Sequence, residues 1–164
     1  MEIFIQNLHE GIHELEEEIP AGQIELPERE LYPNPLKLKI FIDKLENIFR
    51  FKIRISTKAH YTCDRCLDEF DQDFEIMIEQ IYQLGHSELD EDEEIELLPE
   101  DTREIDISPA ISEAFLINRP IKLLCNETCR GLCVDCGTNL NHEKCNCADK
   151  KIDPRFEKLK SLLK

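Results

Sequence analysis

The feature that most constrains this 164-residue chain is the arrangement of its eight cysteines in four closely spaced pairs. The pairs are Cys63–Cys66, Cys125–Cys129, Cys133–Cys136 and Cys145–Cys147. Such spacing lets neighbouring thiolates converge on one tetrahedral metal ion without long-range folding. Eight thiolates are enough for two four-cysteine sites, so the pattern predicts one or two bound ions, and zinc is the expected metal.

The four pairs divide into a compact set and a long-range set. The compact set is Cys133, Cys136, Cys145 and Cys147; the long-range set is Cys63, Cys66, Cys125 and Cys129. The compact set spans fifteen residues and can close on one ion alone, since Gly137 permits a tight backbone turn. His142 could replace a cysteine as ligand, but we expect an exposed loop histidine.

Two other interpretations of the cysteines remain. The sequence Cys63-Asp-Arg-Cys66 resembles a dithiol redox motif, although no βαβ pattern surrounds it. The cysteines could also be free thiols in a core. Residues 1–7 carry no Lys or Arg and no apolar run typical of a secretory signal, and no segment reaches the ~18 apolar residues of a membrane span. We therefore expect a cytoplasmic protein, where paired cysteines favour metal over disulfides.

The charge of the chain limits its partners. The formal net charge is -16, from 36 acids against 20 bases, which argues against binding nucleic acid over a broad surface. A four-cysteine zinc site adds further negative charge. The acidity favours a basic protein partner, or it serves solubility alone. Residues 88–106 hold eleven acids and one base, which indicates a solvated loop or a docking surface for such a partner.

Period-two alternation predicts a β-hairpin around the first cysteine pair. Apolar residues alternate with Arg, Lys and His over residues 48–61, and a second alternation follows Cys66. With Cys63–Cys66 as the turn, paired residue numbers sum to 129. Arg54 then lies opposite Glu75, Ile55 opposite Phe74, and Arg50 opposite Glu79.

The remaining pattern completes an α+β prediction. The expected fold is an antiparallel β-rich N-terminal domain, as a sheet or partial barrel, with a short helix, a Cys-rich zinc module and a C-terminal helix. Further strands are expected at residues 2–8, 36–42 and 95–98; residues 12–19 suit a strand or a helix, and residues 27–31 a helical turn. A helix capped by Ser108 should end at Pro120, and the last should begin at residue 153. The predicted domains are 1–84, β-rich; 85–107, an acidic linker; and 108–164, helical and Cys-rich.

The sequence offers no catalytic arrangement. Its five glycines are scattered rather than grouped in a phosphate-binding loop, and no nucleophile–base pattern can be assigned. An all-cysteine metal site is normally closed, whereas a catalytic zinc keeps an open position. We therefore expect a protein that is not an enzyme and has no small-molecule substrate.

The cysteine motifs resemble those of a known family. The segment LCNETCRGLCVDCGTNLNHEKCNC at residues 124–147, followed by Asp-Pro-Arg-Phe at 153–156, is similar to the C-terminal signature of the YceD family. The Cys-Asp-Arg-Cys-Leu motif at residues 63–67 resembles the other signature. The resemblance covers nearly the whole chain, loosely over the first 35 residues, and departs at Val134, where many relatives have proline. Some relatives keep the first cysteine pair and lose the compact set, which agrees with the division above.

The resemblance implies a role in making or accumulating large-subunit ribosomal RNA. Combined with the acidity, it predicts a zinc-stabilised, non-catalytic ribosome-biogenesis factor that acts through a ribosomal protein or assembly factor of the large subunit, with RNA contacted indirectly. One alternative is direct RNA binding, through the cationic strand face of residues 50–58 or the basic tail. The other alternative is a thiol redox switch at Cys63 and Cys66.

Overall fold

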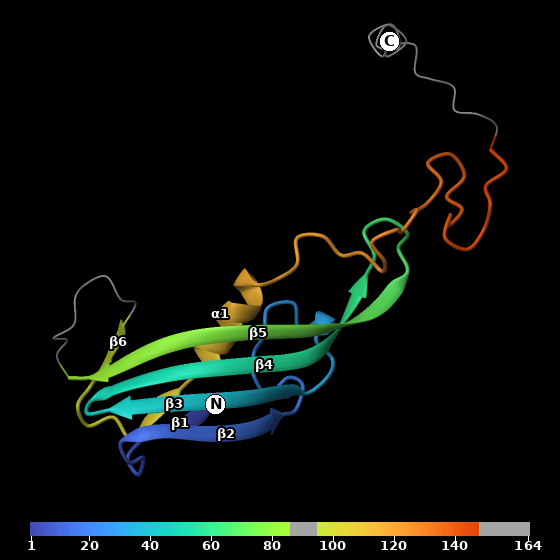
Figure 1. The fold of residues 1–164 in the computed structure, drawn as a ribbon. Helices are drawn as coiled ribbons and strands as arrows, with labels where there is room; N and C mark the ends of the chain where they lie inside the picture. Colours follow the sequence, from blue (N-terminus) through green and yellow to red (C-terminus); the bar gives the residue numbers. More distant parts are fainter. Residues whose placement is uncertain (86–94, 148–164) are drawn as a thin grey trace, which may run out of the picture. The chain divides into compact units, whose positions relative to one another are not determined.

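Alternating apolar residues build a five-stranded sheet with the strand order β2-β3-β4-β5-β6 (Figure 1). The computed structural model describes residues 1–85 and 95–147. The strands are β2 (Gly11–Ile19), β3 (Leu36–Leu45), β4 (Ile48–Thr62), β5 (Glu69–Leu84) and β6 (Ile95–Leu98). β2, β3 and β4 pair antiparallel, whereas β6 runs parallel to β5, so the sheet is mixed.

A second, two-stranded ladder joins distant parts of the sequence. β1 (Glu2–Phe4) pairs antiparallel with β7 (Glu104–Asp106). The first predicted strand is therefore shorter than residues 2–8, and β7 was not predicted. A 3-10 turn, η1 (Arg29–Leu31), lies within the predicted helical turn at 27–31. No helix in the described part of the chain is long and apolar enough to cross a membrane.

Contacts group the chain into two compact units. The sheet unit comprises Met1–Tyr61 and Glu69–Lys122, and the cysteine unit comprises Thr62–Asp68 and Leu123–Lys164, of which residues 148–164 lie outside the described part. All eight cysteines belong to the cysteine unit. The domain limits predicted at 84/85 and 107/108 follow composition rather than contacts and stay a prediction.

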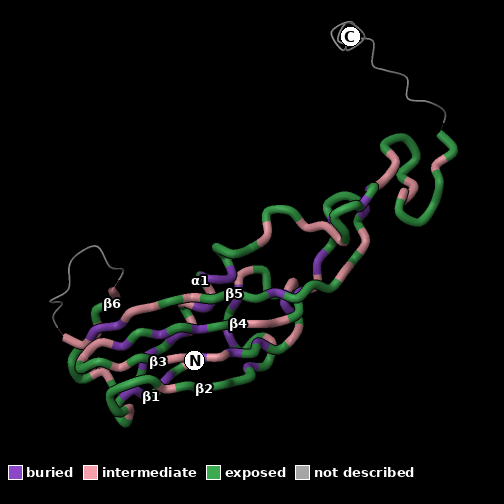
Figure 2. The backbone as a smooth tube through the Cα atoms, in the orientation of Figure 1, coloured by how far each residue is buried: buried purple, intermediate pink, exposed green. Residues whose placement is uncertain are grey.

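One face of the sheet forms the core of the sheet unit. Ile40, Ile42, Phe51 and Ile53 are completely buried on this face, and buried segments run along β3 and β4 in Figure 2. Residues 12–19, which suited a strand or a helix, form the edge strand β2. Its sequence alternates only in part, because Glu16, Glu17 and Glu18 are consecutive, so pairing with β3, in which Leu15 lies opposite Ile40, makes it a strand.

The helix α1 (Ser108–Ile117) packs on β5 and buries Ile111, Ala114 and Phe115, as its apolar stripe predicts. The Phe115 ring lies 4.6 Å from the Tyr32 ring and 5.4 Å from the Phe74 ring, measured between centroids. Such aromatic contacts add to the free energy gained by burying the rings. This cluster therefore joins the helix, the segment after η1 and β5.

The predicted limits of this helix are wrong by a few residues. Ile107 is the cap residue, and Ser108 is inside the helix, where its hydroxyl donates to Asp106 Oδ1 at 2.7 Å. Because the Ser108 hydroxyl is bonded to Asp106, it does not cap an N–H group of the helix. The helix ends at Ile117, before Pro120. The helix predicted from residue 153 lies outside the described residues.

The β4–β5 hairpin forms as predicted, but its register is shifted by two residues. Backbone hydrogen bonds of 2.9 Å link Cys63 N–H to Asp68 and Leu84 N–H to Asn47, and both pairs of numbers add to 131 rather than 129. A shift of two keeps every side chain on its face, so Ile55 and Phe74 are both buried. The cause is a longer loop, because the chain returns through Leu67 at φ 61.

The cross-strand charge pairs follow this shifted register. Lys52 contacts Glu79 at 2.9 Å, in place of the predicted Arg50. The predicted pair between Arg54 and Glu75 is present at 3.4 Å, along a diagonal of the ladder. The cationic strand β4 therefore lies beside an acidic strand, as the hairpin pattern indicates.

Replacing Phe115 by alanine should lower the free energy of unfolding by about 3–5 kcal/mol, because the change leaves a cavity beside Tyr32 and Phe74. Urea unfolding followed by circular dichroism measures this loss. The matched control is Leu116→Ala, since Leu116 is 63% exposed and should change stability by no more than about 0.5 kcal/mol. Equal effects of the two substitutions would contradict the packing of α1.

Candidate metal centres

The first candidate centre begins at the tip of the β4–β5 hairpin. Cys63 directly follows β4, and the Leu67 N–H donates back to its carbonyl at 3.0 Å. This turn places Cys66 beside Cys63 and returns the chain to β5.

Backbone pairing brings the second cysteine pair to this tip. The Asp64 N–H donates to the Leu123 carbonyl at 2.8 Å, and the Leu123 N–H donates to the Asp64 carboxylate at 2.7 Å. The Arg65 guanidinium donates to the Cys129 carbonyl at 2.9 Å. These bonds fix Cys125 and Cys129, which belong to a distant part of the sequence, next to the hairpin.

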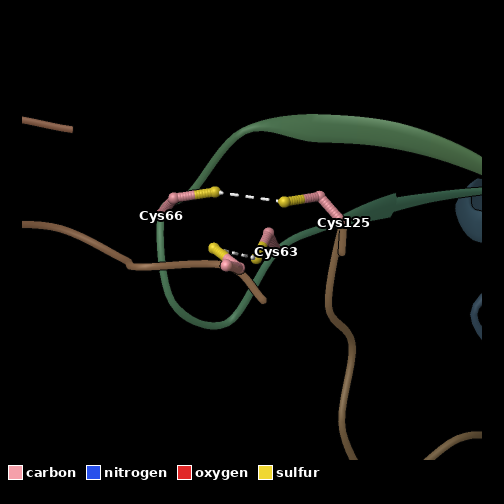
Figure 3. Close-up of side chains that lie close together, drawn as sticks. Cys63, Cys66 and Cys125 are labelled. Carbon is pink, nitrogen blue, oxygen red and sulfur yellow. Dashed lines mark hydrogen bonds between the residues drawn. The ribbon is translucent and has the colours of Figure 1, made fainter. Parts of the chain in front are cut away.

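Four sulfur atoms converge there, within 4.8 Å of one another. The Cys66 and Cys125 sulfurs are 3.5 Å apart and point toward each other in Figure 3. The Cys63 and Cys129 sulfurs are 3.8 Å apart. Cys63, Cys66 and Cys129 are buried, so this first centre (Cys63, Cys66, Cys125 and Cys129) is largely shielded from solvent.

The second centre is formed by the compact set alone. The sulfurs of Cys133, Cys136, Cys145 and Cys147 also lie within 4.8 Å of one another. Cys133 and Cys136 form a knuckle, in which the Gly137 N–H donates to the Cys133 carbonyl at 2.9 Å and Gly137 has φ 73. Cys136 and Cys147 are exposed, so the second centre is open to solvent.

Both clusters have the dimensions of a tetrahedral four-sulfur site. A zinc–sulfur bond of about 2.3 Å places the four sulfurs about 3.8 Å apart. The shorter sulfur–sulfur distances, of 3.3–3.8 Å, agree with this geometry within about half an ångström. Four thiolates occupy every position of such an ion, so each cluster could hold a structural ion with no open position for catalysis.

The acidities of the thiols differ within each centre. Burial raises the pKa of Cys63, yet backbone hydrogen bonds from Cys125, Cys66 and Arg65 outweigh it and bring the pKa to about 6. Burial raises the pKa of Cys66. A thiolate therefore faces a protonated thiol, as expected where like charges crowd together.

The second centre repeats this division. The hydroxyl and backbone of Thr138 lower the pKa of Cys136 to about 6. The neighbouring Cys145 side chain raises the pKa of Cys147. Each centre therefore has at least one thiol with a lowered pKa, which ionises easily, and at least one thiol with a raised pKa, whose proton a metal ion would displace.

Polar side chains between the last two cysteine pairs contact the first centre and the nearby Asp68. Asn141 Nδ2 donates to the Cys129 sulfur at 3.2 Å, and this bond lowers the pKa of Cys129. Asn139 Nδ2 donates to both oxygens of Asp68, at 2.9 and 3.0 Å. His142 Nε2 lies 3.1 Å from Asp68 Oδ2 and is 68% exposed.

The structure thus brings together all eight cysteines that the sequence singled out, in the predicted two sets of four. His142 is in neither set, as expected, although it contacts Asp68 rather than standing alone. Sequence reasoning missed Asp68, Asn139 and Asn141. The Asn-Leu-Asn-His run at 139–142 was the available signal, since three polar side chains sit inside a short loop between ligand pairs.

Comparison with known proteins decides the family. A family model described as large ribosomal RNA subunit accumulation protein YceD matches residues 51–163, which include both centres. This chain belongs to the YceD family. No solved structure matches it.

Curated relatives occur in plants and bacteria. The Arabidopsis thaliana protein named large ribosomal RNA subunit accumulation protein YCED homolog 1, chloroplastic, is 36% identical over 64 residues, or 39% of this chain and 20% of the relative. The Zea mays protein of the same name is 33% identical over 69 residues, or 42% of this chain and 23% of the relative. The uncharacterized protein YlbN of Bacillus subtilis is 26% identical over 132 residues, or 80% of this chain and 76% of the relative.

The matched segment therefore spans only about a fifth of the length of the plant relatives. Because those relatives are chloroplastic by name, a cytoplasmic location of this chain stays a prediction. YceD-family membership itself confirms the resemblance that the cysteine motifs indicated.

Protein purified without chelator should carry two zinc ions, one for each four-sulfur cluster. Replacing Cys63 and Cys66 by serine should remove one ion, and replacing Cys136 and Cys145 by serine should remove the other from its cluster. Native mass spectrometry counts the ions in each protein. Two ions remaining in either variant would show that the assigned cysteines are not the ligands.

Zinc affinity should fall as the pH falls, because protons and the metal compete for the same sulfurs. Cys66 and Cys147 have raised pKa values, so each ion displaces at least one proton near neutral pH. Each displaced proton changes the affinity about tenfold per pH unit. Below about pH 6 the thiolates of Cys63 and Cys136 also protonate, so the dependence should steepen. Competition with a chromophoric chelator between pH 5 and 8 measures the slope, and a flat profile would contradict thiolate ligation.

Proposed function

We propose that this chain is a metal-stabilised, non-catalytic ribosome-biogenesis factor that supports the accumulation of large-subunit ribosomal RNA in the cytoplasm. The observation that carries the proposal is the family match over residues 51–163, since the named plant relatives are large ribosomal RNA subunit accumulation proteins. The match includes both cysteine centres, so the proposed scaffold and the family signature coincide. The protein acts by binding rather than by chemistry.

The cysteine geometry supports a structural role for zinc. In the first centre the short sulfur contacts cross between the two pairs, Cys66 to Cys125 and Cys63 to Cys129. A dithiol switch needs only Cys63 and Cys66, whereas here all four sulfurs lie within 4.8 Å of one another. Zinc at this position links the hairpin tip to residues 125–129, and it would contribute a large share of the folding energy of the cysteine unit, since structural zinc is worth about 10–16 kcal/mol in small peptides.

The charge distribution supports a basic protein as the direct partner. The net charge is -16, and the edge strand β2 exposes Glu14, Glu16, Glu17 and Glu18. Only some of this charge is neutralised locally, because Lys39 contacts Glu14 and Glu16. Basic ribosomal proteins and assembly factors of the large subunit have the complementary charge.

Direct RNA binding is the second candidate, and the ion pairs of β4 weigh against it. Lys52 and Arg54 contact Glu79 and Glu75 on the neighbouring strand. A phosphate would have to displace these carboxylates, which lowers the gain from each contact. RNA contacted through a bound protein agrees better with this arrangement.

Deleting the gene in its own host should lower the ratio of large-subunit to small-subunit ribosomal RNA. The intact gene and the Leu116→Ala variant should restore the ratio, because Leu116 is exposed and lies outside both centres. A Cys63→Ser, Cys129→Ser variant should fail to restore it, because the first centre is lost. RNA gel analysis reads the ratio, and a normal ratio in the deletion strain would refute the proposed function.

Two charge-neutralising variants separate the protein partner from RNA. Glu17→Gln with Glu18→Gln removes two acids, and Lys52→Gln with Arg54→Gln removes two bases, so the changes are matched in size. Capture from cells followed by mass spectrometry and RNA sequencing should show loss of basic large-subunit proteins with the first variant only. If RNA recovery falls with the second variant and not the first, direct RNA binding through β4 is correct.

A further inference from the structure

The loop of the second centre reaches the first centre. Residues 137–144, here called the asparagine loop, lie between the ligand pairs Cys133–Cys136 and Cys145–Cys147. From this loop Asn141 donates a hydrogen bond to the sulfur of Cys129, a residue of the first centre, at 3.2 Å. The same side chain accepts the Arg130 N–H through Oδ1 at 2.8 Å, so its amide has a fixed orientation.

The asparagine loop is held against the hairpin tip at further points. Asn139 donates to both oxygens of Asp68, at 2.9 and 3.0 Å. The Leu132 N–H donates to the Arg65 carbonyl at 3.0 Å, and Leu132 forms a β-bridge with Asn139. Gly131 allows this approach, because a Cβ at that position would lie 2.9 Å from the Arg65 carbonyl oxygen and Gly131 has φ 74.

Only some of these contacts are compatible with a bound ion. Cys66 donates through its thiol to Asp68 at 3.3 Å, and this bond is lost once a metal displaces the thiol proton. The bond from Asn141 to Cys129 persists, because a metal-bound sulfur still accepts hydrogen bonds. Hydrogen bonds to ligand atoms orient them, and their removal typically lowers metal affinity 10–100-fold.

We propose that the two centres bind metal with positive coupling, because closure of the second centre orders the asparagine loop and thereby positions Asn141 on the Cys129 sulfur of the first. Asn141 is a positioning residue, since it acts on a ligand and not on the ion. The inference rests on the metal centres of the proposed function. The amide of Asn141 lies on an exposed loop, so its placement depends on what holds the loop ends.

An ion in the second centre holds those ends. Cys136 and Cys145, whose sulfurs are 3.5 Å apart, flank the asparagine loop on its two sides. Fixing both ends reduces the conformational freedom of the loop in advance, so less entropy is lost when Asn141 binds Cys129. Coupling of this kind is reciprocal, so an ion in the first centre must strengthen the second by the same factor.

The test compares three zinc-binding constants measured by competition with a chromophoric chelator. Cys136→Ser with Cys145→Ser leaves the first centre alone, and Cys63→Ser with Cys66→Ser leaves the second alone. The overall two-ion constant of the intact chain, divided by the product of the two single-centre constants, is the coupling factor. We expect a factor of about ten or more, within the usual range of 5–150-fold.

Asn141→Ala in the intact chain should lower the two-ion constant about tenfold. The matched control is Asn146→Ala, the same change at an exposed asparagine of the cysteine unit with no side-chain hydrogen bond among the described residues, and it should leave the constant unchanged. In the Cys136→Ser, Cys145→Ser background Asn141→Ala should have a smaller effect, because no ion then holds the two ends of the loop.

A coupling factor of one, or equal constants for Asn141→Ala and Asn146→Ala, would overturn the coupling while leaving both metal centres in place. Absence of zinc binding by the intact chain would overturn the metal centres themselves, and the coupling with them. If the Cys136→Ser, Cys145→Ser protein does not fold, the comparison of Asn141→Ala with Asn146→Ala in the intact chain still decides, because both retain every cysteine.

Discussion

The structure of the cysteine unit depends on the convergence of four sulfurs from two distant segments. Cys63 and Cys66 lie at the hairpin tip, and Cys125 and Cys129 belong to a segment about sixty residues later in the sequence. Four thiolates repel one another strongly, so a cluster of this kind is stable only when protons or a metal ion compensate the charge. The divided pKa values show how protons do this, with Cys63 ionised and Cys66 neutral.

Besides forming part of the sheet, the β4–β5 hairpin carries two of the four cysteines of the first centre at its tip. The β4–β5 ladder is long, and its charge pairs and buried faces fix the register of both strands. A fixed register places Cys63 and Cys66 at one end with little freedom, which lowers the entropic cost of ligand assembly. The hydrogen bonds between Asp64 and Leu123 then supply the second half of the centre through backbone pairing rather than through long side chains.

The sequence predicted the features that depend on spacing and periodicity. Ligand spacing grouped the eight cysteines correctly, and alternation located β3, β4, β5 and the buried stripe of α1. The hairpin register was wrong by two residues because a period of two cannot distinguish shifts that preserve the faces. The loop conformation sets the register. Leu67 adopts a left-handed backbone conformation there, which leucine rarely does, so the sequence does not predict it.

Other features could not be predicted from the sequence, for a different reason. The strand β7 is three residues long and exists because it pairs with β1, about a hundred residues earlier. Its partner, and not its composition, makes it a strand. The role proposed for Asn141 likewise depends on a contact between a loop of the second centre and a sulfur of the first. The Asn-Leu-Asn-His run at 139–142 marks a polar loop, but local pattern does not say which sulfur that loop contacts.

The arrangement of charge on the sheet bears on what this YceD-family chain binds. Acidic side chains on β2 and β5 flank the cations of β3 and β4, so the positive charges lie between two negative rows and are partly neutralised there. A polyanion that approaches the cations of β3 and β4 is repelled by the carboxylates of β2 and β5 on either side of them. On β2, Glu18 is exposed and lies opposite Lys37, and it has no ion pair of its own among the described residues, so a basic protein can contact this carboxylate without displacing a cation. The strand pairing that fixes the register of the hairpin therefore also gives the charge arrangement that supports the proposed basic partner.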